Sequence, residues 1–151
     1  MTTTIKFLGA TNTVTGSKFL LSANESSTLI DCGLFQGLKN LRLQNWATPP
    51  FDVAKIDQIV LTHGHLDHSG YTPLLAKHNY NNPIFTTAGT KSLCNILLKD
   101  AAYLQEEEAN YLNHHKLSKH KPALPLYCLK DALKALSLFK GEDYNKWIKS
   151  K

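Results

Sequence analysis

Three histidines and one aspartate fall within six positions of the stretch THGHLDHSG, at residues 62–70. On an extended or looping backbone, residues two apart point to the same side, so His63 and His65 can bind one metal ion together. Asp67 and His68 follow beyond a turn and can bind a second ion. Imidazole and carboxylate ligands suit zinc, and also manganese or iron. The types and the spacing therefore predict a metal site.

A histidine taken singly is more simply a surface residue or a hydrogen-bonded core residue. Four ligand-type residues at this spacing, directly after a strand, favour the metal, because burying so many unpaired polar groups without one would cost several kcal/mol. The remaining histidines lie at predicted helix ends or in a lysine-rich stretch. We expect these four to be solvated: His78, His114, His115 and His120.

The elements around the motif alternate between strands and helices. The apolar run DQIVLT, at 57–62, predicts a buried strand that leads into the motif. Further strands are predicted at 4–9, 18–23, 27–33 and 83–87, and helices at 71–78, from Thr90 onward and at 130–141. The long helix is expected to carry its apolar stripe on Leu93, Ile96, Leu97, Ala101 and Leu104, with a solvated face at 106–108. This alternation indicates an α/β layered fold.

Length and composition limit the classes of protein to which this chain can belong. The 151 residues are enough for one domain with a real core. No apolar stretch approaches the roughly 18 residues that cross a bilayer, and the start lacks a signal-peptide pattern, so we expect a cytoplasmic protein without a membrane partner. Three widely spaced cysteines agree with reduced thiols. The net charge of +5 is compatible with a polyanionic partner, but the lysines at 116, 119 and 121 are interpreted as solvated positions.

The motif also carries a resemblance. HxHxDH with the following Gly70 resembles the metal motif of the metallo-β-lactamase superfamily. FLGATNTVTGSKFLL, at 7–21, looks like the opening hairpin of its RNA-processing β-CASP branch, and LIDCGLFQG, at 29–37, looks like that branch's second landmark in bacterial form. LLKDAAYLQEEEA, at 97–109, and LPLYCLKDALKALSLF, at 124–139, look like segments that follow the metal motif. The resemblance implies the amino-terminal half of a four-layered αββα sandwich.

Roles follow from the resemblance residue by residue. It implies that His63 and His65 bind a first zinc ion and that Asp67 and His68 bind a second. It implies that Asp31 lies outside the ligands and accepts hydrogen bonds that hold the metal loop in shape. The substrate class that it implies is RNA, hydrolysed at its phosphodiesters. Loop positions beside the metals would be Gly9, Thr15, Gly16 and Ser17, for which simple turn chemistry is the alternative.

The sequence also departs from the family pattern. A later histidine in a GHxxGSA-like stretch, a bridging aspartate and a last histidine have no counterpart in residues 1–151, and neither has the β-CASP insert. We therefore expect this chain to be the amino-terminal part of a domain whose remainder is absent. With two ligands per ion, zinc binding should be weak or partial. No catalytic residue beyond the ligands is identifiable, and we expect weak RNA binding without cleavage.

Two other readings stay open at this point. One is a different hydrolase of the same superfamily, acting on a thioester or a lactam, although such enzymes usually lack the DCGLFQG pattern. The other is a non-catalytic remnant that binds a partner chain. Half of a sandwich would leave apolar sheet surface uncovered, which predicts self-association or a missing carboxyl-terminal part.

Overall fold

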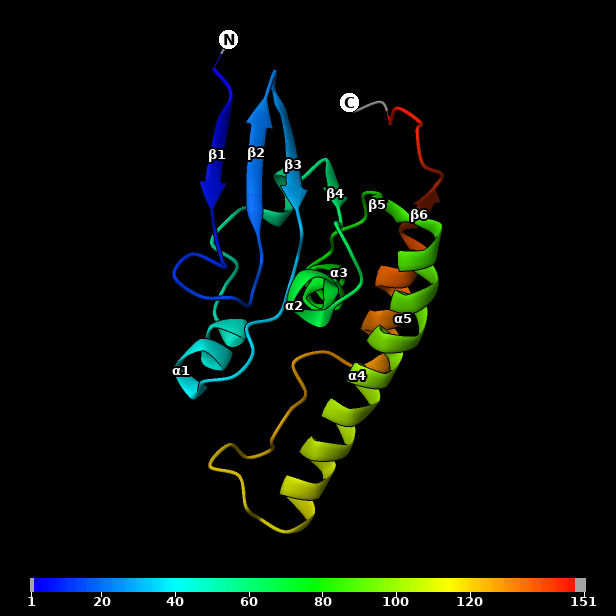
Figure 1. The fold of residues 1–151 in the computed structure, drawn as a ribbon. Coiled ribbons are helices and arrows are strands. Elements are labelled where there is room, and N and C mark those ends of the chain that lie inside the picture. The colour runs from blue at the N-terminus through cyan, green and yellow to red at the C-terminus, as the bar shows by residue number, and fades with distance from the viewer. Residues whose placement is uncertain (1, 149–151) are drawn as a thin grey trace.

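The computed structural model describes residues 2–148 and contains one six-stranded sheet (Figure 1). The strands lie in chain order across the sheet. The first three are antiparallel neighbours, and the third to the sixth are parallel. Their bounds are β1 Thr4–Phe7, β2 Phe19–Ala23, β3 Ser26–Ile30, β4 Gln58–Val60, β5 Ile84–Thr87 and β6 Phe139–Glu142. Parallel order places the carboxyl ends of β3, β4 and β5 at one edge of the sheet.

Helices connect the parallel strands, because two parallel strands can be joined only by a crossover connection. The long helix α4 begins after Thr87, whose side-chain oxygen accepts a hydrogen bond from the Thr90 backbone N–H at 3.2 Å. The bounds are α1 Lys39–Arg42, α2 Leu66–Ser69, α3 Thr72–Lys77, α4 Ala88–His114 and α5 Leu129–Ser137, with short 3₁₀ turns η1 at Leu43–Trp46 and η2 at Val53–Lys55. Within residues 2–148, no helix is both long and apolar enough to cross a membrane.

One row of side chains crosses the sheet and forms its buried face. The pairing register joins Leu20, Leu29, Ile59, Ile84 and Phe139 from strand to strand, and each is at least nine-tenths buried. Side chains from α3, α4 and α5 belong to the same core cluster, so these helices cover this face. The burial of this row fixes the register of every strand that it crosses, because a slip of one residue would turn it to solvent.

The other face of the sheet is less well covered. Its central row, in register, is Phe7, Phe19, Ile30, Val60 and Phe85. Phe7 is 67% exposed, and the other four are only partly buried. Among the described residues this face is therefore only partly covered.

The structure corrects three details of the predicted elements. The helix expected at 130–141 ends at Ser137, and residues 139–142 form β6. The buried face of α4 consists of Cys94, Leu98, Ala102 and Ala109, so the expected apolar stripe was on the wrong face, and Leu93, Ile96 and Leu104 are exposed. Helix α4 packs against α5, whose buried residues Ala132 and Ala135 are also small. Glu106 is not simply solvated, because its carboxylate accepts the Leu129 backbone N–H at 3.1 Å.

Candidate metal centre

The predicted metal loop runs from the end of β4 into α2, at the sheet edge where β3 also ends (Figure 1). Residues 31–34, which continue β3, lie along the loop. The Cys32 N–H donates to the His68 carbonyl at 2.7 Å and the Leu34 N–H donates to the Leu66 carbonyl at 2.9 Å. The Ser17 N–H donates to the Asp67 carbonyl at 2.9 Å. Backbone hydrogen bonds from two separate segments therefore fix the loop in place.

Gly33 is required for this close approach. A Cβ atom at this position would lie 1.5 Å from the backbone oxygen of Asp67. No side chain fits there, so the pairing of residues 31–34 with the loop depends on a glycine. The DCG sequence is thus tied to the geometry of the histidine loop.

The four predicted ligands lie together. His63 Nε2 is 3.0 Å from His65 Nδ1, and the rings of His63 and His68 are 4.0 Å apart between centroids. His68 Nε2 is 3.6 Å from Asp67 Oδ2. His65 is exposed and the other three are partly buried, so the cluster opens to solvent on one side. Among residues 2–148, no group of three histidines, cysteines or acids is placed to hold a metal ion.

Asp31 lies beneath the cluster and is 3% exposed. Its carboxylate accepts His68 Nδ1–H at 2.7 Å, the Thr62 N–H at 2.8 Å and the Thr62 hydroxyl at 2.9 Å. A third side chain, Ser17, donates its hydroxyl at 3.3 Å. Asp31 itself has φ +58°, a left-handed conformation that aspartate tolerates better than most residues. This one carboxylate joins the opening loop, β3 and the histidine loop.

These hydrogen bonds also determine which ring nitrogens are available. The single hydroxyl proton of Thr62 is directed to Asp31, so the hydroxyl oxygen must accept from His63 Nδ1, 3.0 Å away. His68 Nδ1–H is likewise held by Asp31. In the neutral form of each ring the lone pair therefore lies on Nε2, and that of His63 faces His65 Nδ1 at 3.0 Å. A metal ligand needs such a lone pair, so the donors fit a metal ion in chemistry.

The pKa of His63 is lowered from its ordinary value. Desolvation is the largest cause, and the neighbouring His68 and His65 lower it further, against smaller opposing effects of Asp31 and Asp67. A lowered pKa keeps the imidazole neutral near pH 7. The neutral ring is the form that binds a metal.

A buried lysine contacts residues 31–34, the segment that pairs with the metal loop. Lys18 is 3% exposed, and its ammonium donates to the carbonyl of Gly33. It also lies over the rings of Phe35, at 4.7 Å, and Tyr71, at 4.3 Å. Burial lowers the pKa of Lys18 to about 8, against a smaller opposing effect of Cys32. Burial raises the pKa of that thiol to about 12, which keeps it protonated.

Only some of the residues around the histidine cluster could be identified from the sequence. Ser17 contacts Asp31, and Thr15 of the same opening loop pairs with Gln36. The parts played by Thr62 and Lys18 were missed. Thr62 directly precedes His63 at the strand end, which was an available signal, whereas nothing near Lys18 in the sequence indicates its aromatic neighbours. The four histidines expected to be solvated, His78, His114, His115 and His120, are exposed.

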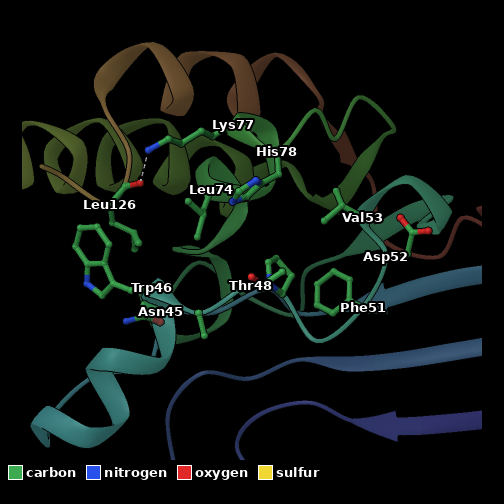
Figure 2. Close-up of a pocket in the computed structure, with 12 residues that line it drawn as sticks. Asn45, Trp46, Thr48, Phe51, Asp52, Val53, Leu74, Lys77, His78 and Leu126 are labelled. Carbon is green, nitrogen blue, oxygen red and sulfur yellow. Dashed lines mark hydrogen bonds between the residues drawn. The ribbon is translucent and has the colours of Figure 1, made fainter.

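Two hollows lie outside the histidine cluster. A pocket of about 420 Å³ is lined by residues that include Trp46, Phe51, Leu74 and Lys77. Figure 2 shows Lys77 donating to the Leu126 carbonyl at its wall, at 2.9 Å. A larger groove of about 1040 Å³ separates α1 and η1 from α4. Leu66, next to His65 and Asp67 in the chain, lines this groove, so the groove reaches the segment that carries the cluster.

Comparisons with known proteins place the chain among relatives. The family model described as a β-lactamase superfamily domain matches residues 27–132. A ribonuclease of Thermus thermophilus is 34% identical over 141 residues, which are 93% of this chain and 28% of that protein. The transcription termination factor FttA of Methanosarcina mazei is 40% identical over 94 residues, which are 62% of this chain and 15% of that protein. The chain thus spans less than a third of the length of either relative.

The solved structures agree in fold. A subclass B3 metallo-β-lactamase from a soil metagenome library matches with a TM-score of 0.51 and 13% identity. The match covers 96% of this chain and 45% of that enzyme. At this identity the likeness concerns the fold alone.

Proposed function

We propose that this chain, which belongs to the β-lactamase superfamily, is a member of the RNA-processing β-CASP branch and supplies one half of the metal site of an RNA hydrolase. Support comes from the relative that is named a ribonuclease and from the histidine cluster at the sheet edge. The single observation that carries the proposal is the hydrogen bonding of Asp31 and Thr62, which places the lone pairs of neutral His63 and His68 on Nε2.

In this proposal His63 and His65 hold one zinc ion, and Asp67 and His68 hold the other. A pair of such ions supplies an activated water and stabilises the charge that develops on a phosphodiester. The chain's own contribution is orientation. Asp31 and Thr62 fix the ring tautomers, and the backbone hydrogen bonds of residues 31–34 fix the loop that carries the ligands.

We further propose that residues 1–151 alone do not cut RNA. Catalytic zinc sites use three protein ligands and a water for each ion, whereas the cluster offers two donors for each. Positioning of the phosphodiester supplies a large share of the rate and needs walls on both sides of the metals. The cluster is instead open to solvent on one side.

The test is a chimera with the Thermus ribonuclease, in which residues 1–151 replace the homologous segment. We expect the chimera to cleave end-labelled RNA when zinc or manganese is added, and its His63→Ala variant to be at least 100-fold slower. The isolated chain, assayed in parallel, should leave the RNA intact. Circular dichroism and gel filtration establish that the compared chimeras fold alike.

The outcomes separate the alternatives. A folded chimera that hydrolyses a thioester or a lactam but not RNA would replace the proposal by another hydrolase of the superfamily. A folded chimera that is inactive on all three substrates would favour a non-catalytic remnant. Cleavage by the isolated chain, lost in its His63→Ala variant, would keep the RNA hydrolase but contradict its incompleteness.

A further inference from the structure

The end of α4 and the turn after it carry a concentration of basic side chains. Residues 114–121, HHKLSKHK, hold three lysines and three histidines and no acidic residue. Three of the 17 lysines and arginines of the chain thus fall within one stretch of eight residues. Each of these six side chains is exposed. We refer to residues 114–121 as the basic turn.

The lysines of the basic turn have no acidic partner within residues 2–148. The two ion pairs that lysines make there are Lys55 with Asp52 and Lys146 with Asp143. An unneutralised cluster of this kind attracts polyanions, and the attraction grows with the number of phosphates it contacts.

The basic turn is held in a defined shape. The side chain of Asn113 donates to the Ala123 carbonyl at 2.9 Å and accepts the Ala123 N–H at 2.7 Å. The Leu117 N–H donates to the Leu112 carbonyl at 3.0 Å. These bonds close the turn across its base, so the lysines project from a preorganised surface, which lowers the entropy cost of binding.

Exposed rings lie beside these charges. The ring of Tyr111, which is 58% exposed, is 4.4 Å from that of His115, and His114 packs on His115 at 4.9 Å between centroids. Rings of this kind stack on unpaired bases, while lysines contact the backbone. Charge and stacking together are the chemistry that recognises single-stranded nucleic acid.

The groove of about 1040 Å³ connects the basic turn to the histidine loop. Its lining includes Ser118 and His120 at the turn, and Leu66 at the loop. Phe35, Trp46, Lys39 and Arg42 line the side formed by α1, η1 and the segment before them, and Asp100 and Glu108 line the side formed by α4. The α1 side therefore offers aromatic surface and positive charge to a strand, whereas the α4 side repels phosphates.

We propose that the basic turn is a binding surface for single-stranded RNA, and that the strand continues from it along the α1 side of the groove to the histidine loop. The inference rests on the proposed function and assigns its substrate a path. The basic turn holds the backbone at a distance from the reacting bond, and the groove leads the strand to the metals.

Binding to a fluorescein-labelled single-stranded RNA, followed by anisotropy at several salt concentrations, tests the proposal in the intact 151-residue chain. The variant Lys116→Gln/Lys119→Gln/Lys121→Gln removes the charge of the basic turn. The matched control Lys91→Gln/Lys130→Gln/Lys140→Gln removes the same charge from three other exposed lysines. We expect the turn variant to bind at least tenfold more weakly, with a salt slope smaller by about 2 for three lost phosphate contacts.

The control variant should stay within threefold of the wild type, and Tyr111→Ala should weaken single-stranded more than double-stranded RNA. Equal weakening by the two triple variants would contradict a localised surface, as would binding by the turn variant at the wild-type level. A preference for double-stranded RNA would contradict the groove path. Because binding is measured without cleavage, an intact effect in the His63→Ala background supports the surface even if the chimera proves inactive.

Discussion

Asp31 is the residue on which the arrangement of the histidine cluster depends. It receives hydrogen bonds from three side chains, which come from the opening loop, the end of β4 and α2. An ionised carboxylate can accept all of them because it has two oxygens and no proton of its own. Its effect on the ligands is exerted through the far nitrogens of the rings, so it should be measurable as metal affinity.

Replacing Asp31 by Asn should weaken zinc binding by 10- to 100-fold, because the amide cannot accept the same set of donors and the ring tautomers are released. Competition with a chromophoric chelator measures the affinity. Asp57→Asn is the control, since Asp57 accepts the Ser27 N–H at 2.8 Å in a turn outside the cluster. Equal zinc affinity in the wild type and in Asp31→Asn would contradict a role for Asp31 in metal binding.

Lys18 should make stability rise with pH. Its pKa falls from 10.5 to about 8 on folding, so the unfolded chain binds more protons between these values. Keeping the ammonium buried at pH 7 therefore costs about 3 kcal/mol relative to the neutral amine. We expect the free energy of unfolding to rise by about 1 kcal/mol from pH 7 to pH 9, and Lys18→Met to abolish the rise.

Urea denaturation at pH 7, 8 and 9 measures both proteins. Cys32 acts in the opposite direction, because its raised pKa removes stability as the pH passes about 9, the ordinary value for its thiol. The comparison is therefore made at pH 9 and below. Parallel pH dependences of the wild type and Lys18→Met would show that the buried ammonium is not destabilised as described.

At the scale of elements, the pairing of residues 31–34 with the histidine loop depends on Gly33. Gly33→Ala places a methyl group against the Asp67 backbone, so we expect a loss of several kcal/mol in stability or of zinc binding. Gly89→Ala is the matched control, because nothing lies within 4 Å of its added Cβ in α4 and alanine favours helix. Thermal unfolding and zinc titration of both variants check this. A Gly33→Ala variant with wild-type values would contradict the close approach.

Several elements could be predicted from the sequence because their local patterns are strong. The apolar run before the histidines and the Pro73 helix start are examples, and β4 and α3 follow them. Strand β6 could not be predicted from the sequence, because FKGE has little strand propensity. This segment is extended through its pairing with β5. The buried face of α4 was missed because the helix is apolar on two sides. Leu97 and Leu104 line the groove, whereas Cys94, Leu98, Ala102 and Ala109 are buried.

The candidate site likewise has parts that could be predicted from the sequence and parts that could not. The meeting of His63, His65, Asp67 and His68 was predictable, since all four lie within six residues, and the role of Asp31 was implied by the family resemblance. The contribution of Thr62 depends on which acceptor its hydroxyl chooses. That of Lys18 depends on Phe35 and Tyr71, which come from distant parts of the chain. Such contacts exist only once the fold is formed.

For the molecule as a whole, the less covered face of the sheet should drive self-association of the isolated chain. Burial of its central row gains roughly 25 cal/mol for each Å² removed from water. We expect multi-angle light scattering to show dimers or larger species that Phe7→Glu reduces. Ile96→Glu is the control, because Ile96 is also 67% exposed but lies on α4. A wild-type chain that is monomeric at all concentrations would contradict this prediction.

The central claim is that the histidine loop is half of a metal site with preset ring nitrogens. Long-range ¹H–¹⁵N correlation of the histidine rings, during a zinc titration of the chain, tests it most directly. Before zinc, His63 and His68 should carry their proton on Nδ1. Zinc should then shift Nε2 of these two rings and Nδ1 of His65, and the response should vanish in His63→Ala/His65→Ala. Zinc that instead shifts the rings of His114, His115 or His120, and leaves residues 63–68 unchanged, would contradict the claim.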